Sequence, residues 1–227
     1  MQVLRKLSIL SRPYWFLRKS YWRAKCKLGL TDYCQKFAIK KLQIGCSINV
    51  LPDWFNVDII PFYDGSYFMD ATREFPIPDE TFDYVFSEHM IEHIDYLQGW
   101  HMLKECYRVL KPNGKIRIAT PDLRKLVDLF REDKTDAQQE YIQSVMQTWR
   151  PEVNSDAEGY VVNVVFGFDH KFIYDEATLT IALQKAGFTN IKLMNPRESQ
   201  FPELSHLDVY VGDYIEFETL VMEAEKA

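Results

Sequence analysis

Short apolar runs recur along most of the chain, and each is followed by residues that favour turns. Residues 42–44 and 55–60 are two of these runs, with Gly45 after the first and Asp58 near the end of the second. Similar runs predict a short third strand at 67–70, which ends in an acid, and a buried strand at 81–87. Apolar runs of this length between turn residues are typical of buried strands.

Segments with helical spacing lie between the later runs. A long helix is expected from Glu88, and residues 111–114 (Lys-Pro-Asn-Gly) stop it. Its apolar face includes Ile91, Ile94, Leu97, Trp100, Leu103 and Leu110. Residues 115–119 form the next strand, and Pro121 begins a further helix. The pattern ends with a helix from 175 or 176 to 186, closed by Gly187, and with strands at 189–194 and 214–224.

Strands that alternate with helices predict an α/β fold of the Rossmann-like, doubly wound kind, with a mostly parallel sheet covered on both faces. The connection between the first two strands has only about ten residues and contains Pro52, so it leaves little room for a crossover helix. Residues 133–170 break the alternation. They are expected to form an insertion that is partly helical at 137–148.

Residues 1–30 are expected to form a helical arm outside a single domain of residues 31–227. After a break at residues 11–13, one helical face would carry Tyr14, Leu17, Tyr21, Ala24 and Leu28, and Gly29 is placed to end the helix. Basic residues surround this face, and Trp15 and Trp22 lie beside it. Such a helix could rest on an anionic membrane surface, or it could pack on its own domain or on a partner subunit.

Charge is distributed unevenly along the chain. Residues 1–41 hold 11 Lys and Arg against one acid, Asp32. The whole chain holds 27 basic and 33 acidic residues, so the remainder holds 16 basic and 32 acidic ones. A polyanion would therefore meet the arm and not the body, and general nucleic-acid binding is not expected.

The four cysteines show no metal-binding or disulfide spacing, which fits a reducing compartment. No apolar run reaches the roughly 18 residues of a membrane span, and the basic N-terminus lacks the apolar segment of a secretory signal. We therefore expect a cytoplasmic protein, with peripheral membrane contact through the arm as one alternative. The oligomeric state stays open.

Gly45 and Asp58 suggest a nucleotide-type ligand. A glycine after the first strand lets the backbone turn sharply and leaves room for a ligand. An acid after the second strand can accept both hydroxyls of a ribose, as in nucleotide-binding α/β folds. A plain buried strand followed by a turn would give the same two residues.

Four segments in a fixed order carry a more specific resemblance. They are Leu-Gln-Ile-Gly-Cys-Ser (42–47), Asn-Val-Asp (56–58), Phe-Asp-Tyr-Val-Phe-Ser-Glu-His (82–89) and Arg-Val-Leu-Lys-Pro-Asn-Gly-Lys-Ile-Arg-Ile (108–118). Together they resemble the class I S-adenosylmethionine-dependent methyltransferases. The resemblance covers roughly residues 40–224 and is greatest to a small bacterial group with Ser-Glu-His-x-x-Glu-His after the fourth strand. It implies the fold above, with an antiparallel last strand.

The resemblance also implies which residues bind S-adenosylmethionine. Ile44, Gly45, Cys46 and Ser47 would surround its methionine and ribose portion, with Asp58 and the adjoining Ile59 at the ribose hydroxyls. Asp70 and Ala71 would address the adenine ring, and Ser87 and Glu88 would lie beside the methionine end. The chain departs from the family at Ser47, where a second glycine is usual, and in the short connection that follows.

His89, Glu92 and His93 are candidates for the chemistry, because their spacing would place them on one helical face. The spacing also suits a divalent metal, and it is similar to the Glu-x-x-Glu-His element of metal-dependent small-RNA and ubiquinone-pathway O-methyltransferases. His170, from the insertion, could add a ligand or act as general base. Histidines that only support the fold are the third possibility.

The leading functional hypothesis is an O-methyltransferase that acts on a sugar, a glycan or another small hydroxyl acceptor. The glycan part rests on the resemblance, because members of that family often accompany carbohydrate-modifying enzymes. A non-catalytic scaffold with the methyltransferase fold is the alternative. A nicotinamide dehydrogenase is disfavoured, because Gly-x-Gly-x-x-Gly is absent.

Overall fold

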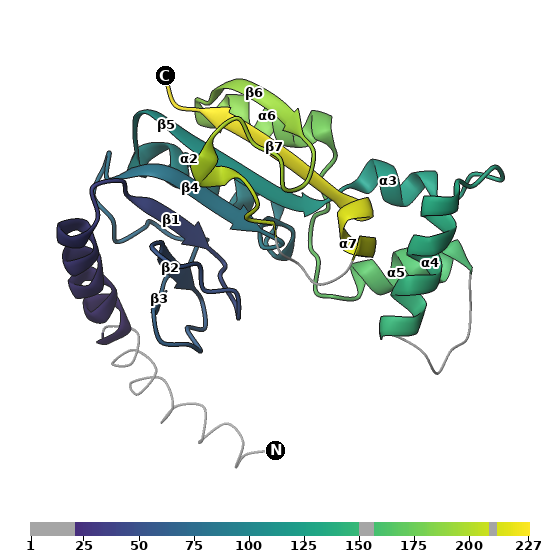
Figure 1. Ribbon diagram of the computed structural model, residues 1–227, viewed down its shortest axis with the longest axis horizontal. Helices are drawn as coiled ribbons and strands as arrows, with labels where there is room; N and C mark the ends of the chain where they lie inside the picture. The colour runs from purple at the N-terminus through teal and green to yellow at the C-terminus, as the bar shows by residue number, and fades with distance from the viewer. Residues whose placement is uncertain (1–20, 150–156, 209–212) are drawn as a thin grey trace, which may run out of the picture.

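A single seven-stranded sheet forms the centre of the computed structural model, which describes residues 21–149, 157–208 and 213–227 (Figure 1). Its strand order is β3-β2-β1-β4-β5-β7-β6. The strands are β1 (Lys41–Ile44), β2 (Phe55–Asp58), β3 (Ser66–Phe68), β4 (Phe82–Glu88), β5 (Leu110–Pro121), β6 (Thr189–Met194) and β7 (Thr219–Glu225). Strands β1 to β5 are parallel, and β7 runs antiparallel between β5 and β6. The predicted fold class is confirmed.

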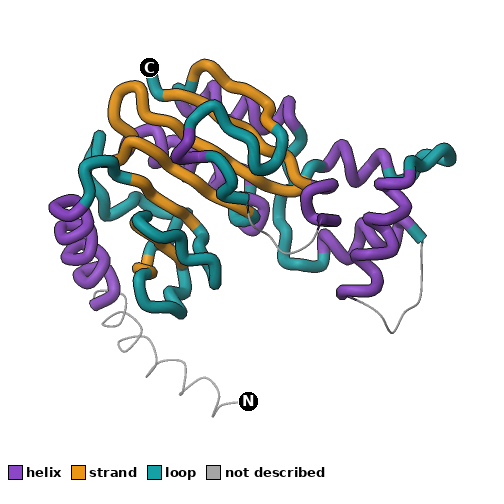
Figure 2. The backbone as a smooth tube through the Cα atoms, in the orientation of Figure 1, coloured by secondary structure: helices purple, strands orange, loops and turns teal. Residues whose placement is uncertain are grey.

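Helices cover one face of this sheet and an irregular segment covers part of the other. One core cluster joins the sheet to the helix at 21–36, to α2 (Tyr96–Val109) and to α6 (Glu176–Ala186). A separate cluster on β4 packs under the β1–β2 connection and under the turn η2 (Pro202–Leu204). In Figure 2 this turn and its flanking loops cross the sheet face nearest the viewer.

The helix at 21–36 corrects the prediction for the arm. It continues through Gly29, where a Cβ would lie 2.1 Å from Tyr67 Cε1, so the glycine allows close packing and does not end the helix. Cys26, Leu30 and Tyr33 are buried in the core, as the packing alternative predicts for this part of the arm. The expected apolar face is exposed instead, at 64% for Tyr21 and 69% for Leu28. The predicted break at 11–13 and positions 14, 15 and 17 lie outside the described residues.

The predicted single helix from residue 88 to 110 is also wrong. Strand β4 continues to Glu88, His89 has a left-handed φ of 44°, and a 3₁₀ turn, η1 (Ile91–His93), follows. Helix α2 begins only after Asp95, whose side chain accepts from Gln98 N while Gln98 caps the Asp95 backbone. This reciprocal capping box is a strong start signal for a helix. His89, Glu92 and His93 therefore do not share an α-helical face.

The insertion contains α4 (Asp136–Trp149), as predicted, and an unpredicted helix α5 (Glu158–Phe166). With α3 (Leu123–Asp128) and the segment before α6, they enclose a hydrophobic cluster separate from the main core. In Figure 1 these helices lie beyond the end of the sheet. Residues 150–156 of the predicted insertion lie outside the described residues.

Two further boundaries differ from the prediction. Residues 213–218 form helix α7 (Asp213–Glu218), so strand β7 begins at Thr219 and not near 214. Asp122 caps α3 by accepting from Arg124 N, so this helix begins after Asp122 and not at Pro121. The expected end of α6 at Gly187 is confirmed by its φ of 109°.

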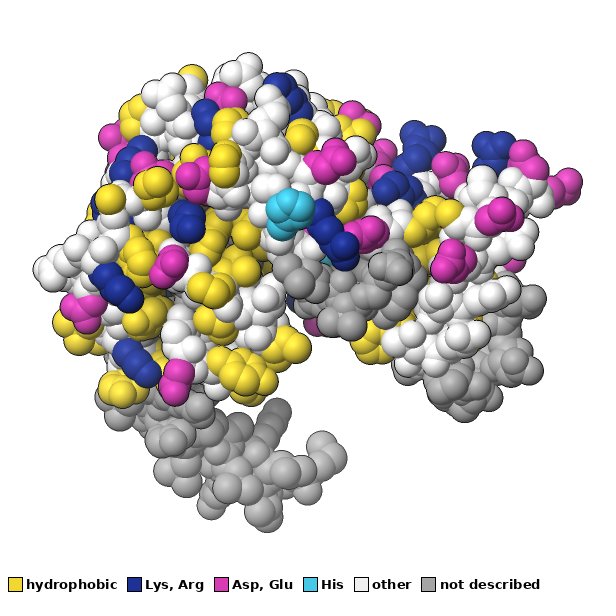
Figure 3. Space-filling view, in the orientation of Figure 1, with side chains coloured by type: hydrophobic (Ala, Val, Ile, Leu, Met, Phe, Trp, Pro, Cys, Tyr) yellow, Lys and Arg dark blue, Asp and Glu magenta, His cyan; other side chains and the backbone are white. Residues whose placement is uncertain are grey.

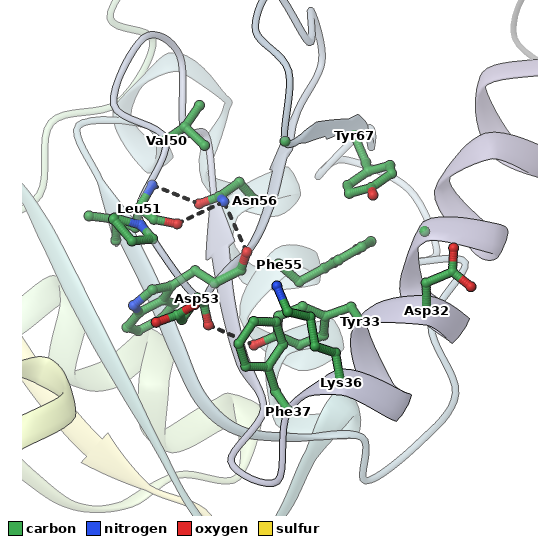
Figure 4. Close-up of a pocket in the computed structure, with 14 residues that line it drawn as sticks. Asp32, Tyr33, Lys36, Phe37, Val50, Leu51, Asp53, Phe55, Asn56 and Tyr67 are labelled. Atoms are coloured by element: carbon green, nitrogen blue, oxygen red, sulfur yellow. Dashed lines mark hydrogen bonds between the residues drawn. The ribbon is translucent and has the colours of Figure 1, made fainter.

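Strand β2 joins β1 without a helix, as predicted. The side chain of Asn56 binds backbone groups of this connection, which no helix pairs. It accepts from Leu51 N at 3.1 Å and donates to the carbonyls of Leu51 and Trp54. The loops that follow β1 and β2 leave apolar side chains exposed, and such side chains gather along the lower edge of Figure 3. Figure 4 shows Asn56 on the lining of a hollow that also includes Tyr33 of the first helix and Phe37, which directly follows that helix.

A buried arginine fixes the irregular segment on the second face. Arg117 of β5 is fully buried, although its neighbours Ile116 and Ile118 face the main core. Its guanidinium contacts Asp208 through two nitrogens and donates to Glu223 Oε1 at 2.7 Å and to the carbonyl of Glu198 at 2.8 Å. Two carboxylates and a backbone carbonyl thus compensate the buried positive charge.

We predict that Arg117→Met lowers the free energy of unfolding by about 3–5 kcal/mol, because it leaves the acids of Asp208 and Glu223 buried without their cation. Urea unfolding followed by circular dichroism measures this change. Arg131→Met is the matched control, because Arg131 and its partner Asp133 are both largely exposed, and it should not move the midpoint. Equal stability of the two variants would contradict the structural role of Arg117.

Candidate active site

A crevice of about 390 Å³ opens at the carboxyl ends of β1, β2 and β3 and beside β4. Ligands bind at this edge in open α/β sheets, where the strand order reverses between the first and fourth strands. Predicted site residues on its lining are Ile44, Gly45, Ser47, Asp58, Ile59, Asp70, Ala71, His89 and His93. Its volume lies within the range of small-molecule sites.

The turn after β1 and the acid after β2 are joined by hydrogen bonds. Gly45 has a φ of 76° and donates its N–H to the carbonyl of Val57 at 2.9 Å. The Ser47 N–H donates to Asp58 Oδ2 at 2.9 Å, and the Ile60 N–H donates to Oδ1 at 2.8 Å. Each oxygen of Asp58 keeps a second lone pair, so the carboxylate is both fixed and able to accept from a ligand.

Asp70 follows β3 and closes a short turn at the other end of the crevice. Its Oδ1 accepts from the Thr72 N–H at 3.1 Å and from the Thr72 hydroxyl at 2.6 Å. These bonds present Asp70 and Ala71 on the lining, at the place where the adenine ring is expected.

Three predicted cofactor residues are buried beneath the crevice and do not line it: Cys46, Ser87 and Glu88. Burial raises the pKa of the Cys46 thiol to about 12, so this cysteine is neutral at physiological pH. Ser87 pairs with Ile44 across β4 and β1, and its buried hydroxyl has no hydrogen-bond partner in the described part of the chain. The Ser87 hydroxyl, which can both donate and accept, therefore lies unpaired where the strand order reverses.

Glu92 is the buried carboxylate of the histidine cluster. It lies 3.3 Å from His89 Nδ1 and accepts from the Thr120 hydroxyl at 3.0 Å. Burial alone would raise the pKa of Glu92, but His89 brings it below its ordinary value. Burial likewise lowers the pKa of His89, but Glu92 outweighs it and the pKa ends above its ordinary value. His89 and Glu92 thus form a buried ion pair.

His93 and His170 complete the cluster. Their ring centroids are 4.7 Å apart, and one ligand atom each from Glu92, His93 and His170 lies within 4.8 Å of the others. Lys171 N and Phe172 N donate to the Glu92 carbonyl, which fixes His170 beside η1. His170 Nδ1 is buried without a hydrogen-bond partner among the described residues. Burial lowers the pKa of His170 to about 4.

The sequence prediction missed several residues of the crevice: Met69, Thr72, Met90, Ile94 and Asp169. Met90 packs on the glycine turn, since a Cβ at position 45 would lie 2.4 Å from Met90 Cγ. Gly45 is therefore required by this side chain as well as by its positive φ. All five adjoin predicted site residues in the sequence, and that adjacency was the available signal.

Residues 62–118, which span β3, β4, α2 and most of β5, match a family profile described as "Methyltransferase domain". No curated protein matches this chain. The match covers one methyltransferase-type segment of the chain, and the sheet order is that of a Rossmann-like methyltransferase fold.

Solved structures of low sequence identity include several methyltransferases. A SAM-dependent methyltransferase from Archaeoglobus fulgidus is 18% identical, with 94% of this chain and 100% of that chain covered and a TM-score of 0.49. A possible histamine N-methyltransferase from Thermotoga maritima is 17% identical, with 94% and 97% covered and a TM-score of 0.46. Haemonchus contortus phosphoethanolamine N-methyltransferase 2, crystallised with S-adenosyl-L-methionine, is 16% identical, with 84% and 49% covered and a TM-score of 0.46.

The crevice can be compared with S-adenosylmethionine, the cofactor that the sequence resemblance implies. Asp58 offers free lone pairs for ribose hydroxyls, and Gly45 adds no side chain of its own to the floor. The residues present are thus compatible with S-adenosylmethionine.

We predict that Asp58→Ala weakens binding of S-adenosylhomocysteine by about 2–3 kcal/mol, because charge-assisted hydrogen bonds to the ribose are lost. Isothermal titration calorimetry measures the affinity. Asp53→Ala is the control, since Asp53 is exposed in the β1–β2 connection and does not line the crevice. Unchanged affinity in a folded Asp58→Ala protein would remove Asp58 from the ribose role.

Proposed function

We propose that the protein transfers a methyl group to a hydroxyl of a sugar, a glycan or another small acceptor. One observation carries the proposal: His89, His93 and Asp169 line the same crevice as Gly45, Asp58 and Asp70. His93 and Asp169 therefore bring an imidazole and a carboxylate to the expected cofactor site, while His89 is held in its ion pair with Glu92. Bound S-adenosylmethionine supplies the electrophilic methyl group.

The protein's own task in such a transfer is alignment and proton removal. The β1 turn and Asp58 would hold the cofactor end, and the end of the insertion would hold the acceptor opposite it. A hydroxyl acceptor must lose its proton, so a neutral nitrogen or a carboxylate has to face it. The described site contains both kinds of group in Glu92, His93 and His170.

We further propose that Glu92, His93 and His170 hold a divalent transition-metal ion. A pKa of about 4 makes His170 a weak base at neutral pH, but it keeps the imidazole neutral, as a metal ligand must be. The unpartnered Nδ1 and the donor set of two imidazoles and one carboxylate suit such an ion. The ion would act as a Lewis acid that makes a nearby hydroxyl more acidic.

We also propose that the protein works in the reducing cytoplasm and that its acceptor is not a nucleic acid. All four cysteines are free, and Cys26, Cys46 and Cys106 are buried. The acidic body of the chain would repel a polyanionic acceptor, whereas a neutral sugar hydroxyl meets no such barrier.

We predict that His170→Ala lowers turnover by about tenfold or more, because the proposed metal site loses a ligand. Affinity for S-adenosylhomocysteine should stay within a few-fold, because His170 does not line the cofactor end. Methyl transfer from radiolabelled cofactor to a panel of sugars measures turnover, and calorimetry measures affinity. Binding of NAD in place of S-adenosylhomocysteine, or of neither, would overturn the methyltransferase proposal.

A second prediction tests the metal without any need for activity. Zn²⁺ or Mn²⁺ titrated into chelator-treated protein should bind, and His93→Ala or His170→Ala should weaken binding by more than about tenfold, the loss expected even for a supporting residue of a metal site. His101→Ala is the control, because His101 lies on α2 outside the cluster. Equal binding by all variants would exclude this site and leave Glu92 and the histidines as proton acceptors.

A further inference from the structure

The outer side of the helix at 21–36 is both basic and apolar. Arg23, Lys25 and Lys27 are exposed beside Tyr21 and Leu28, and Asp32 is the helix's one acid. The opposite side of the same helix is buried in the core, so the outer side is held in a fixed orientation. Trp22 is half-buried, with its ring 5.6 Å from that of Tyr21 and under Lys25 Nζ.

A groove of about 630 Å³ runs between this helix and the loop after β3. The helix contributes Arg23, Ala24 and Lys27, and the loop contributes Arg73, Glu74, Phe75 and Pro76. Three cationic side chains therefore converge from two segments against a single acid. None of the three has an ion-pair partner among the salt bridges of the described residues.

Apolar loops lie next to this groove at the cofactor edge. Arg73 directly follows Thr72, which lines the cofactor crevice. The loops after β1 and β2 expose Ile48, Ile59, Ile60, Phe62 and Tyr63, and Phe62 is 72% exposed. The start of the described helix and these loops share the lower edge of the molecule in Figure 1, where Figure 3 shows hydrophobic side chains.

We propose that this edge docks on an anionic lipid bilayer, with Arg23, Lys27 and Arg73 at the phosphates and Phe62 and Tyr63 at the apolar boundary. The combination of a basic groove with exposed aromatic side chains fits a bilayer interface better than an acidic protein, which would need only the charges. Attachment is peripheral: in the part of the chain that the structure describes, no helix has the length and apolar character to cross a membrane. The inference does not depend on the proposed methyl transfer.

Sedimentation of the full chain with vesicles tests the proposal. The protein should bind vesicles of phosphatidylcholine mixed with phosphatidylglycerol and not vesicles of phosphatidylcholine alone. Binding should fall as salt rises, because screening weakens contacts with surface charge. Failure to bind the anionic vesicles, or equal binding to both kinds, would overturn the proposal and leave the groove to a soluble acidic partner.

Matched variants locate the contact. The triple variant Arg23→Gln, Lys27→Gln, Arg73→Gln should lower the partition coefficient by about a hundredfold, the sum expected for three basic residues at such a surface. The control Lys104→Gln, Lys185→Gln, Lys192→Gln makes the same charge change at exposed positions elsewhere and should bind nearly as the unmodified protein does. An equal loss of vesicle binding in both triple variants would show that only net charge matters, and it would reject the groove as the contact site.

A second pair of changes tests the apolar part. Phe62→Ser with Tyr63→Ser keeps the charge and should lower partition by about tenfold or more, because apolar area is no longer buried in the interface. Thermal unfolding midpoints equal to that of the unmodified protein establish that each variant is folded. Unchanged partition would leave a purely electrostatic contact and contradict the role of this loop.

Discussion

The site depends on one buried carboxylate, that of Glu92. A fully buried carboxylate is tolerated only when it is paired and hydrogen-bonded, and here His89 and Thr120 provide those contacts. Its backbone carbonyl also accepts from the two residues that follow His170. One residue thus joins the end of β4, strand β5 and the end of the insertion. The crevice edge of the sheet and the end of the insertion therefore meet at Glu92.

A second buried charge determines how the sheet is covered. Where other α/β folds place helices on both faces, this chain holds an irregular segment on one face through Arg117. Burying a charge is costly, so the arrangement persists only because the guanidinium finds carboxylates and carbonyls together. The short β1–β2 connection belongs to the same face and replaces a crossover helix with the hydrogen bonds of Asn56.

The sheet could be predicted from the sequence because apolar runs and turn residues report burial directly. Gly45, Asp58 and Asp70 could be placed at one edge for the same reason, since they follow parallel strands. The break at His89 could not be predicted, because a histidine does not by itself indicate a left-handed φ. Asp95 and Gln98, however, form a capping box that marks the true start of the helix. The buried side of the first helix was also missed. That side packs through Gly29 and Cys26, and a prediction based on the spacing of large apolar residues does not include such small residues.

The two halves of the crevice differ in how they are built. Most residues of its lining follow strands of the main core, whereas Asp169 comes from the end of the insertion, a lobe with its own hydrophobic cluster. Polar contacts link that lobe to the segments beside the sheet: the Tyr141 hydroxyl bonds to Glu218 of α7, and backbone bonds run to Glu92 of η1. Changes inside the lobe can therefore alter the acceptor side without disturbing the cofactor side. Strand order therefore determines only the fold, and the reaction and its acceptor have to be argued from the residues of the crevice and the lobe.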